Sequence, residues 1–506
     1  MRRLLPLLLL VAGCDDRAPF QPPPMDSFYF PSGLALTAPA GGNQTLLVAS
    51  SNFDLQFLPG SGGTLLAVDP RPATEGGSAV AGGNLLDGHL LGPGARLGSF
   101  TGPLVLVDGT SCPGAAAALP SGKAALTASR FNQDLQLVGL LDDGSVEACG
   151  AGGCGVPLDG RFLDPYAITL ACRADGARRS AFVGYLRTPP QWIIPPVVPP
   201  APALPVFIPA DTGWVTEVDL DDPGLRSRSI SLVPGPVGAM AYDATADQLY
   251  LLGHYQTTIA PATAPVTVFD LSACRATDPT CPLPASVTVD LFPIFHGIDL
   301  QQIVLSTVQP GLSRRAYVLA RLFDADQAAV NFTRPTTDLG GVLLVLDLTP
   351  GPYGHPLLTV LRAVQTGIGP GDLKLLPARP GQRDLMVVTS STDGVLWVYD
   401  DDQGTLVRNI PVDPGSGTGL IGRDPYALAV EPAPHLDAAG VEKDRVYVAS
   451  FLQDMVSIVD VPVLDPGQAD IVRDAAGQPL RIGPVQYNAT VLPGGSVTPI
   501  LPFLPP

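Results

Sequence analysis

The stretch that decides the fold lies near the C-terminus: Arg423-Asp-Pro-Tyr-Ala-Leu-Ala-Val430, then Arg445-Val-Tyr-Val-Ala-Ser450, then Met455-Val-Ser-Ile-Val-Asp460. The first segment starts at a proline turn, and the other two are rich in β-branched residues that alternate with period two. The pattern predicts a strand after the turn, a second strand, a short turn, and a third strand that ends in aspartate.

The same order recurs six more times toward the N-terminus. The copies lie at 369–372, 385–390 and 395–400; at 296–299, 316–320 and 342–347; at 236–238, 249–253 and 266–270; at 164–167, 181–184 and 214–219; at 31–33, 46–50 and 65–69; and, most weakly, at 102–103, 125–129 and 135–138. Seven units of roughly 55 to 73 residues fit a ring of four-stranded sheets, whose closure protects the strand edges. The sequence therefore predicts an all-β chain, a β-propeller of seven four-stranded blades over residues 26–482.

Val446-Tyr-Val-Ala-Ser450 followed by Val456-Ser-Ile-Val-Asp460 resembles the YVTN-type propeller repeats of bacterial surface proteins, over about residues 31–461. The resemblance implies a ligand face around the central channel, formed where the first strands begin and where second strands turn into third strands. Closure of the ring has two candidates. Ser27–Phe30 is favoured as the outer strand of the last blade, and Leu480–Ile482 is the local alternative.

The N-terminus has the three parts of an export signal. Arg2 and Arg3 precede a short apolar run at 4–11, which is too short to span a bilayer, and Val11-Ala-Gly-Cys14 ends it. This ending resembles the lipobox of bacterial lipoproteins. The resemblance implies a leader at 1–13, a lipid on Cys14, a tether at 14–25 and a lipid-anchored place in the cell envelope. The periplasmic face of the inner or outer membrane and the cell surface all remain open, as does an ordinary secretory signal with a chance cysteine.

Composition excludes several partners. The chain has 47 acidic and 29 basic residues and a formal net charge of -18. Such a charge opposes binding to nucleic acid and to anionic lipid headgroups, so the acyl chains on Cys14 must supply the affinity for the membrane.

Six cysteines remain once Cys14 carries lipid, and an even number in an exported chain predicts three disulfides. Proximity in the chain favours Cys149–Cys154 and Cys274–Cys281. Cys112–Cys172 is then the pair that is left, although other pairings stay open.

Two segments lie outside the repeat. Residues 189–210 are dense in proline and are expected to leave the third blade as a polyproline-like excursion. The excursion is either a docking arm or a segment that folds back on its own blade, and folding back is favoured. Residues 483–506 form a tail rich in proline and leucine.

The candidate ligand face carries six residues. Two similar turns contribute Asp164 with Tyr166 and Asp424 with Tyr426, and comparable positions hold His296 and Asp372. The second-to-third turns add Asp54, Asp134, Asp324, Asp393 and Asp454. Such an acidic face could bind a cation or a positively charged partner, because convergent carboxylates are ligands that suit Ca²⁺. The favoured alternative is that aspartate caps tight turns, and no cofactor is predicted.

The sequence offers no nucleophile elbow, phosphate loop or zinc spacing. We therefore expect a monomeric, non-enzymatic binding or scaffold protein that presents this loop face to a protein or glycan partner. The rival is a metal-dependent lactonase or hydrolase at the mouth of the channel, so enzymatic activity stays undecided, with binding favoured.

Overall fold

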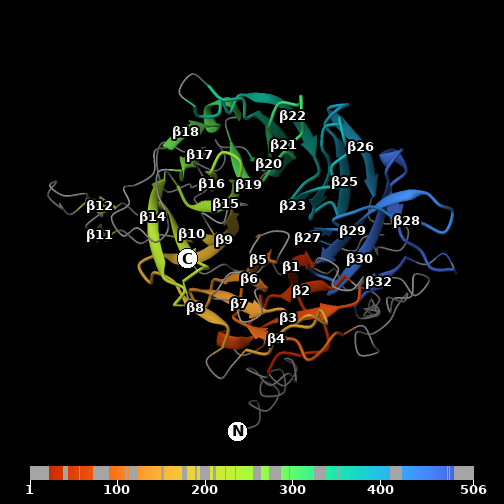
Figure 1. Cartoon of the computed structure of the whole chain (residues 1–506), viewed down its shortest axis with the longest axis horizontal. Helices are drawn as coiled ribbons and strands as arrows, with labels where there is room; N and C mark the ends of the chain where they lie inside the picture. The colour runs from red at the N-terminus through yellow and green to blue at the C-terminus, as the bar shows by residue number, and fades with distance from the viewer. Residues whose placement is uncertain are drawn as a thin grey trace, which may run out of the picture.

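Seven antiparallel sheets, here called blades 1 to 7 in chain order, surround a central axis (Figure 1). The computed structural model describes residues 22–37, 44–55, 57, 59–71, 90–108, 112, 123–149, 153–173, 179–187, 191–193, 206–208, 212–222, 224–233, 235–254, 264–272, 286–295, 297–323, 338–351, 354–410, 424–475, 477 and 479–483. The architecture is a seven-bladed β-propeller, as the repeat predicts. Among the described helices, none is long and apolar enough to cross a membrane.

The first four blades each use consecutive segments of chain. Blade 1 is β1 (Pro31–Leu36), β2 (Leu46–Ser50), β3 (Gly63–Val68) and β4 (Ala95–Leu97), with the short helix η1 (Pro59–Ser61) before β3. Blade 2 is β5 (Thr101–Val107), β6 (Ala124–Ser129), β7 (Asp134–Gly139) and β8 (Gly155–Pro157). Blade 3 is β9 (Leu163–Cys172), β10 (Arg179–Arg187), β13 (Gly213–Asp219) and β14 (Ser227–Val233). Blade 4 is β15 (Val237–Asp243), β16 (Gln248–Gly253), β17 (Pro265–Asp270) and β18 (Ser286–Asp290).

The last three blades follow the same order. Blade 5 is β19 (Ile298–Leu305), β20 (Arg315–Phe323), β21 (Asp338–Asp347) and β22 (Val360–Thr366), preceded by α1 (Phe292–Phe295). Blade 6 is β23 (Pro370–Leu375), β24 (Leu385–Ser390), β25 (Val395–Asp400) and β26 (Thr405–Ile410). Blade 7 is β27 (Pro425–Val430), β29 (Glu442–Ser450), β30 (Met455–Pro462) and β31 (Asp470–Ile471), with β28 (His435–Leu436), η3 (Pro466–Gln468) and β32 (Arg481–Ile482) added. In every blade the first strand lies nearest the axis (Figure 1).

The core is divided into layers between neighbouring blades. The second strand of a blade is covered on both faces, and β2, β6, β16 and β24 are buried at every position. This explains why the repeat reads as apolar runs such as Leu46–Ser50 rather than as strict alternation. One layer joins blade 7 to blade 1, where Phe28 and Leu34 pack with Ile458 and Ile482. Burial of apolar surface at this seam therefore closes the ring.

The predicted closure by an N-terminal strand is wrong. β31 and β32 both pair with β30, so blade 7 takes its outer strands from its own neighbourhood, as the local alternative proposed. Ser27–Phe30 forms no strand but lies along the seam, where the Phe30 N–H donates to Asp454 Oδ1 at 2.8 Å. No strand is exchanged between the first and last blades among the described residues, so the seam is held by non-covalent contacts.

Asp454 makes the seam sensitive to pH. Burial raises the pKa of this carboxyl to about 6; the Phe30 N–H lowers the pKa, and nearby Asp54 raises it further. Because the folded-state pKa is raised, the native state binds the proton more tightly than the unfolded chain does. The resulting stabilisation is complete below about pH 4, declines as the pH rises, and is lost above about pH 6.

Asp454→Asn cannot ionise and keeps an oxygen for the Phe30 N–H. We expect this variant to be more stable than the wild type by about 1–2 kcal/mol at pH 7.5 and equally stable near pH 4. Urea denaturation at both pH values measures the difference. An equal difference at the two pH values would show that Asp454 does not titrate as described.

The repeated aspartates at the ends of third strands form turns. Each accepts a hydrogen bond from the backbone N–H two residues later, at 2.9 to 3.1 Å, in Asp69, Asp219, Asp270, Asp347 and Asp400. A short carboxylate that bonds its own backbone is the reason for aspartate in such turns. The repetition of aspartate at these ends therefore has a structural cause.

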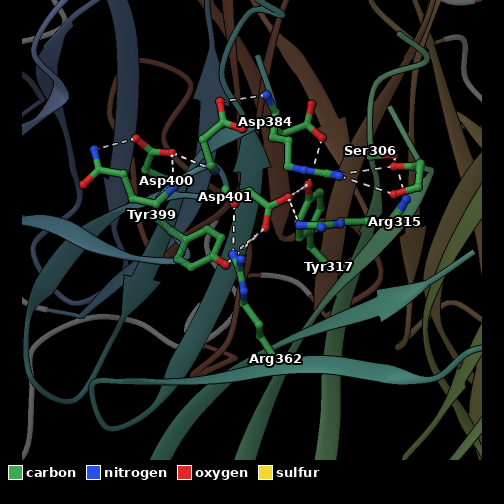
Figure 2. Close-up of polar contacts among 12 residues, drawn as sticks. Ser306, Arg315, Tyr317, Arg362, Asp384, Tyr399, Asp400 and Asp401 are labelled. Atoms are coloured by element: carbon green, nitrogen blue, oxygen red, sulfur yellow. Dashed lines mark hydrogen bonds and ion pairs between the residues drawn. The ribbon is translucent and has the colours of Figure 1, made fainter. Parts of the chain in front are cut away.

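Ion pairs connect neighbouring blades. Arg173 pairs with Asp247 across blades 3 and 4, Arg314 with Asp243 across blades 4 and 5, and Arg379 with Asp444 across blades 6 and 7. Figure 2 shows the connection between blades 5 and 6, where Arg315 Nη1 lies 2.6 Å from Asp401 Oδ2. The Tyr317 hydroxyl lies between Asp401 and Asp384, at 2.8 and 2.9 Å.

Two cysteine pairs are placed for disulfides, as predicted. Cys112 and Cys172 join blades 2 and 3 with a Cα–Cα distance of 5.0 Å, and Cys149 and Cys154 lie 5.1 Å apart before β8. These distances suit a disulfide. Cys274 and Cys281 lie outside the described residues, so that predicted pair stays a prediction.

The proline-rich insertion differs from the predicted polyproline-like excursion. Its described residues form β11 (Gln191–Ile193) and β12 (Val206–Ile208), which pair as an antiparallel hairpin with Trp192 opposite Phe207. The hairpin is a separate sheet from blade 3 and lies outside the ring, beyond β14 (Figure 1). Prolines lie outside these two short runs, so the backbone N–H groups needed for pairing are present.

Candidate functional site

A cavity of about 230 Å³ lies on the face where first strands begin and second strands end. Its walls come from blades 6, 7, 1, 2 and 3: Ser32, Ser51, Phe53, Phe100, Thr101, Arg130, Tyr166, Ser391, Asp424, Tyr426 and Phe451. Each of these residues belongs either to the start of a first strand or to a second-to-third turn. The loops that the repeat places on one face therefore meet in one cavity.

β-Bulges aim two tyrosines into this cavity. The pairing of β9 with β10 skips Tyr166, and the pairing of β27 with β29 skips Tyr426, so each is the extra residue of a bulge. Their hydroxyl oxygens lie 3.2 Å apart although the two strands belong to blades 3 and 7. Gly102 of blade 2 packs beside Tyr166, where a Cβ would lie 3.3 Å from the Tyr166 carbonyl oxygen. Bulges of this kind commonly redirect side chains at functional sites.

Four residues at or just before the start of first strands adopt a left-handed backbone. Phe30, Phe100, Asp164 and Asp424 have φ of 47°, 57°, 58° and 56°. Blades 5 and 6 place Gly297 and Gly369 at the comparable positions, where φ is also positive. Glycine adopts this conformation without strain, whereas another residue costs roughly 1–2 kcal/mol. The phenyl ring of Phe100 is therefore kept against a backbone preference, whereas aspartate at 424 tolerates this conformation, and both residues line the cavity.

Half-buried aromatic rings form a continuous cluster around the cavity. Phe53 lies 5.8 Å from Phe100 and 5.5 Å from Phe451, measured between ring centroids, and both pairs are edge-to-face. Tyr426 lies 5.4 Å from Phe451, and Phe30 lies 5.2 Å from the same ring. The cluster covers the seam between blades 7 and 1, so the cavity and the ring closure share residues.

The cavity contains one arginine, Arg130, and its surroundings fix it. Its Nε donates to Asp164 Oδ1 at 3.1 Å, and its guanidinium lies 5.9 Å from the centre of the Tyr166 ring. Asp164 also pairs with Arg187 at 3.3 Å, and its N–H donates to Gln133 Oε1 at 2.9 Å. Asp164 is thus a support for Arg130 rather than an open ligand.

Asp424 lies across the cavity from this group. Burial raises the pKa of its carboxyl, and a hydrogen bond with Ser391 lowers it by a smaller amount. The pKa of the Tyr426 hydroxyl lies well above its usual value because of the neighbouring Tyr166 hydroxyl and burial. Asp424 is therefore easier to protonate than an exposed aspartate, and the Tyr426 hydroxyl keeps its proton as a hydrogen-bond donor.

Of the six predicted face residues, Tyr166, Asp424 and Tyr426 line the cavity and Asp164 lies beside it. Asp372 lies elsewhere in the channel, where it accepts from Gln302 Nε2 and from the Leu428 N–H, both at 2.9 Å. It connects blades 5, 6 and 7. His296 lies outside the described residues. Asp393 and Asp454 accept the backbone N–H groups of Ile368 and Phe30, which lie outside their own turns.

His254 is a face residue that the sequence reasoning missed. It directly follows β16, at the position that Arg130 occupies after β6, and its Nδ1 pairs with Asp299 Oδ1 of blade 5. Burial lowers the pKa of His254, but the Asp299 carboxylate outweighs this and raises it overall. His254 directly follows the predicted strand 249–253, as Arg130 follows 125–129, so the repeat could have placed it on this face.

No described group of three or more histidine, cysteine, aspartate or glutamate side chains converges in a way that could hold a metal ion. The Ca²⁺ interpretation therefore stays a prediction. The described part of the chain shows no arrangement of ligands that supports it.

Comparison with known proteins gives no family. No family model matches the chain, and no curated protein matches it. Solved structures with a similar chain path include a putative 6-phosphogluconolactonase from Bacteroides uniformis, with 14% identity, a TM-score of 0.42, and coverage of 76% of this chain and 86% of that one. A putative 6-phosphogluconolactonase from Bacteroides fragilis has 14% identity, a TM-score of 0.41, and coverage of 76% and 85%.

Proposed function

We propose that this chain is an envelope-anchored, non-enzymatic binding lipoprotein whose channel-face cavity holds one sugar residue of a glycan partner. The observation that carries the proposal is the lining of the cavity. Aromatic rings and hydroxyl side chains meet there, at the one face that loops from five blades share.

The chemistry of the lining favours a sugar. Phe53, Phe100 and Phe451 offer apolar faces against which the C–H groups of a pyranose ring can pack. Hydroxyls of Ser32, Ser51, Thr101, Ser391 and the two tyrosines offer donors and acceptors for a polyol. The volume of about 230 Å³ is below the roughly 300–1,000 Å³ of pockets for drug-sized ligands, which suits a single ring.

The anchor is part of the proposal. Residues 1–21 lie outside the described residues, so the leader, the lipid on Cys14 and the envelope location rest on the lipobox Val11–Cys14 and the charge pattern before it. The first described residues, Pro22 to Phe30, lead directly into the seam below the cavity.

One observation favours the rival, a hydrolase or lactonase. Asp424 is the carboxyl among the cavity-lining residues, and its raised pKa would suit a general acid. A hydrolase at this site would depend on Asp424. Release of product from ester, lactone or glycoside substrates, lost in Asp424→Asn, would replace the binding proposal with this one.

Phe100→Gly gives the sharpest test of sugar binding. The substitution removes a ring from the cavity, and relief of the left-handed strain offsets part of the stability lost with the contact to Phe53. We expect about a tenfold loss of affinity, or ~1.4 kcal/mol, for the best-binding monosaccharide in calorimetric titration of the full-length protein. The panel contains hexoses, N-acetylhexosamines and hexuronates.

Phe131→Ala is the matched control, because this phenyl ring is 47% exposed and lies outside the cavity. Its affinity should equal that of the wild type. A wild-type protein that binds no member of the panel, or a Phe100→Gly protein that binds as tightly as the wild type, would overturn the proposal.

A further inference from the structure

Arg130 has more hydrogen-bond donors than its described neighbours use. The side chain carries five N–H groups, and only Nε donates, to Asp164 Oδ1 at 3.1 Å. The two terminal nitrogens have no partner among the described residues, although the side chain is only 25% exposed and lines the cavity. These donors are accessible from the cavity, where a bound ligand could supply an acceptor for them.

Contacts with neighbouring residues fix the position of the Arg130 guanidinium. Asp164 holds Nε, the Gln133 side chain bridges the Asp164 N–H and the Arg130 carbonyl, and the Tyr166 ring lies beneath the guanidinium. Such a preorganised guanidinium loses little freedom when it binds an anion in a two-point contact.

The local charge is opposite to that of the chain. Arg130 and Arg187 share one carboxylate, Asp164, which leaves one positive charge at this edge of the cavity. His254 on the same face is paired with Asp299. Asp424 across the cavity is the opposing carboxyl, and burial biases it toward its neutral form. A protein with a formal net charge of -18 thus keeps a cationic group at its binding cavity.

We propose that the ligand is an acidic sugar residue whose carboxylate bonds the terminal nitrogens of Arg130, which makes Arg130 the specificity-determining residue. This inference rests on the proposed function and narrows it to one class of sugar. The sugar ring packs against the aromatic cluster, its hydroxyls contact the serine and threonine side chains, and its carboxylate lies at Arg130. Burial raises the pKa of Asp424, which lowers the cost of protonating this carboxyl when the carboxylate of the ligand binds nearby.

A matched pair of ligands tests the inference: methyl glucuronoside against methyl glucoside, titrated into the full-length protein. We expect the wild type to bind the glucuronoside at least tenfold more tightly, with the preference reduced at high salt. Arg130→Met should reduce the glucuronoside affinity to about that of the glucoside. Arg161→Met removes the same charge from a side chain that is 52% exposed, pairs with Asp159 and lies outside the cavity, so it should change the preference less than threefold.

The pH dependence supplies a second readout. Glucuronoside affinity should rise as the pH falls from 8 to 5.5, because Asp424 takes up a proton on binding, and Asp424→Asn should remove this dependence. Glucose 6-phosphate serves as a separate arm. Tighter binding of the phosphate than of the glucuronoside would assign the anion to phosphate and overturn the carboxylate assignment.

The results distinguish a failure of the acidic-sugar inference from a failure of sugar binding itself. Equal wild-type affinity for glucuronoside and glucoside overturns the acidic-sugar inference but leaves a sugar-binding cavity. Failure to bind either ligand overturns both.

Discussion

Replacing Asp401 with alanine is expected to lower the free energy of unfolding by about 3–5 kcal/mol. Asp401 is fully buried between blades 5 and 6, where its carboxylate contacts Arg315 Nη1 at 2.6 Å, the Tyr317 hydroxyl at 2.8 Å and the Tyr399 hydroxyl at 3.2 Å (Figure 2). Without the carboxylate, the guanidinium of Arg315 stays buried and loses its opposite charge. An uncompensated buried charge is among the most destabilising defects that one substitution can create.

Urea or guanidinium denaturation of the wild type and Asp401→Ala measures this effect. Asp402→Ala is the neighbouring control, because Asp402 is exposed and accepts one backbone N–H, from Arg383, at 3.0 Å. We expect the control to lie within about 1 kcal/mol of the wild type. A change below 1 kcal/mol in Asp401→Ala would mean that the connection between blades 5 and 6 does not depend on this ion pair.

Cys14→Ser is expected to move the protein from the membrane fraction to the soluble fraction, which is the largest functional change that we predict. Acyl chains contribute roughly 0.8 kcal/mol per buried methylene, so their loss removes essentially all membrane affinity from a chain with a formal net charge of -18. Cell fractionation and incorporation of labelled fatty acid measure the change.

Cys149→Ser is the matched control. It removes another cysteine, the partner of Cys154, without touching the lipobox, and should stay in the membrane fraction with its fatty-acid label. A Cys14→Ser protein that remains in the membrane fraction, or a wild type that takes up no fatty acid, would contradict the anchor.

The number and order of the blades could be predicted because the repeat is local. The turn at Asp424-Pro, the buried run Arg445–Ser450 and the run Met455–Asp460 all lie within residues 424–460, so the pattern itself specifies neighbouring strands. The tyrosines of the site could be predicted for the same reason. Asp424-Pro-Tyr and Asp164-Pro-Tyr are copies of one turn.

Closure of the ring could not be predicted from local patterns. Ser27–Phe30 has the composition of a strand, but its neighbours are side chains more than 400 residues away, such as Asp454 and Ile482. The short strands β31 and β32 already pair with the outer edge of β30. The N-terminal segment therefore packs along the seam instead of forming a strand there.

The ligand-facing role of Arg130 could not be predicted from a local pattern either, because it depends on a contact with another blade. Its position, one residue beyond the predicted strand 125–129, can be found from the repeat. Its contact with Asp164, which leaves the terminal nitrogens open toward the cavity, follows only from the way blade 2 packs against blade 3. The aromatic cluster is similar, because Phe53, Phe100 and Phe451 come from three separate blades.

The most direct test of the central claim is a crystal structure of the full-length protein with the monosaccharide that binds most tightly. We predict a pyranose ring packed against Phe100 and Phe451, with its substituents at Arg130 and Asp424. Sugar bound elsewhere, such as in the larger groove between the outer strands of blades 1 and 2 at Arg96 and Gln136, with the channel-face cavity empty, would contradict the account.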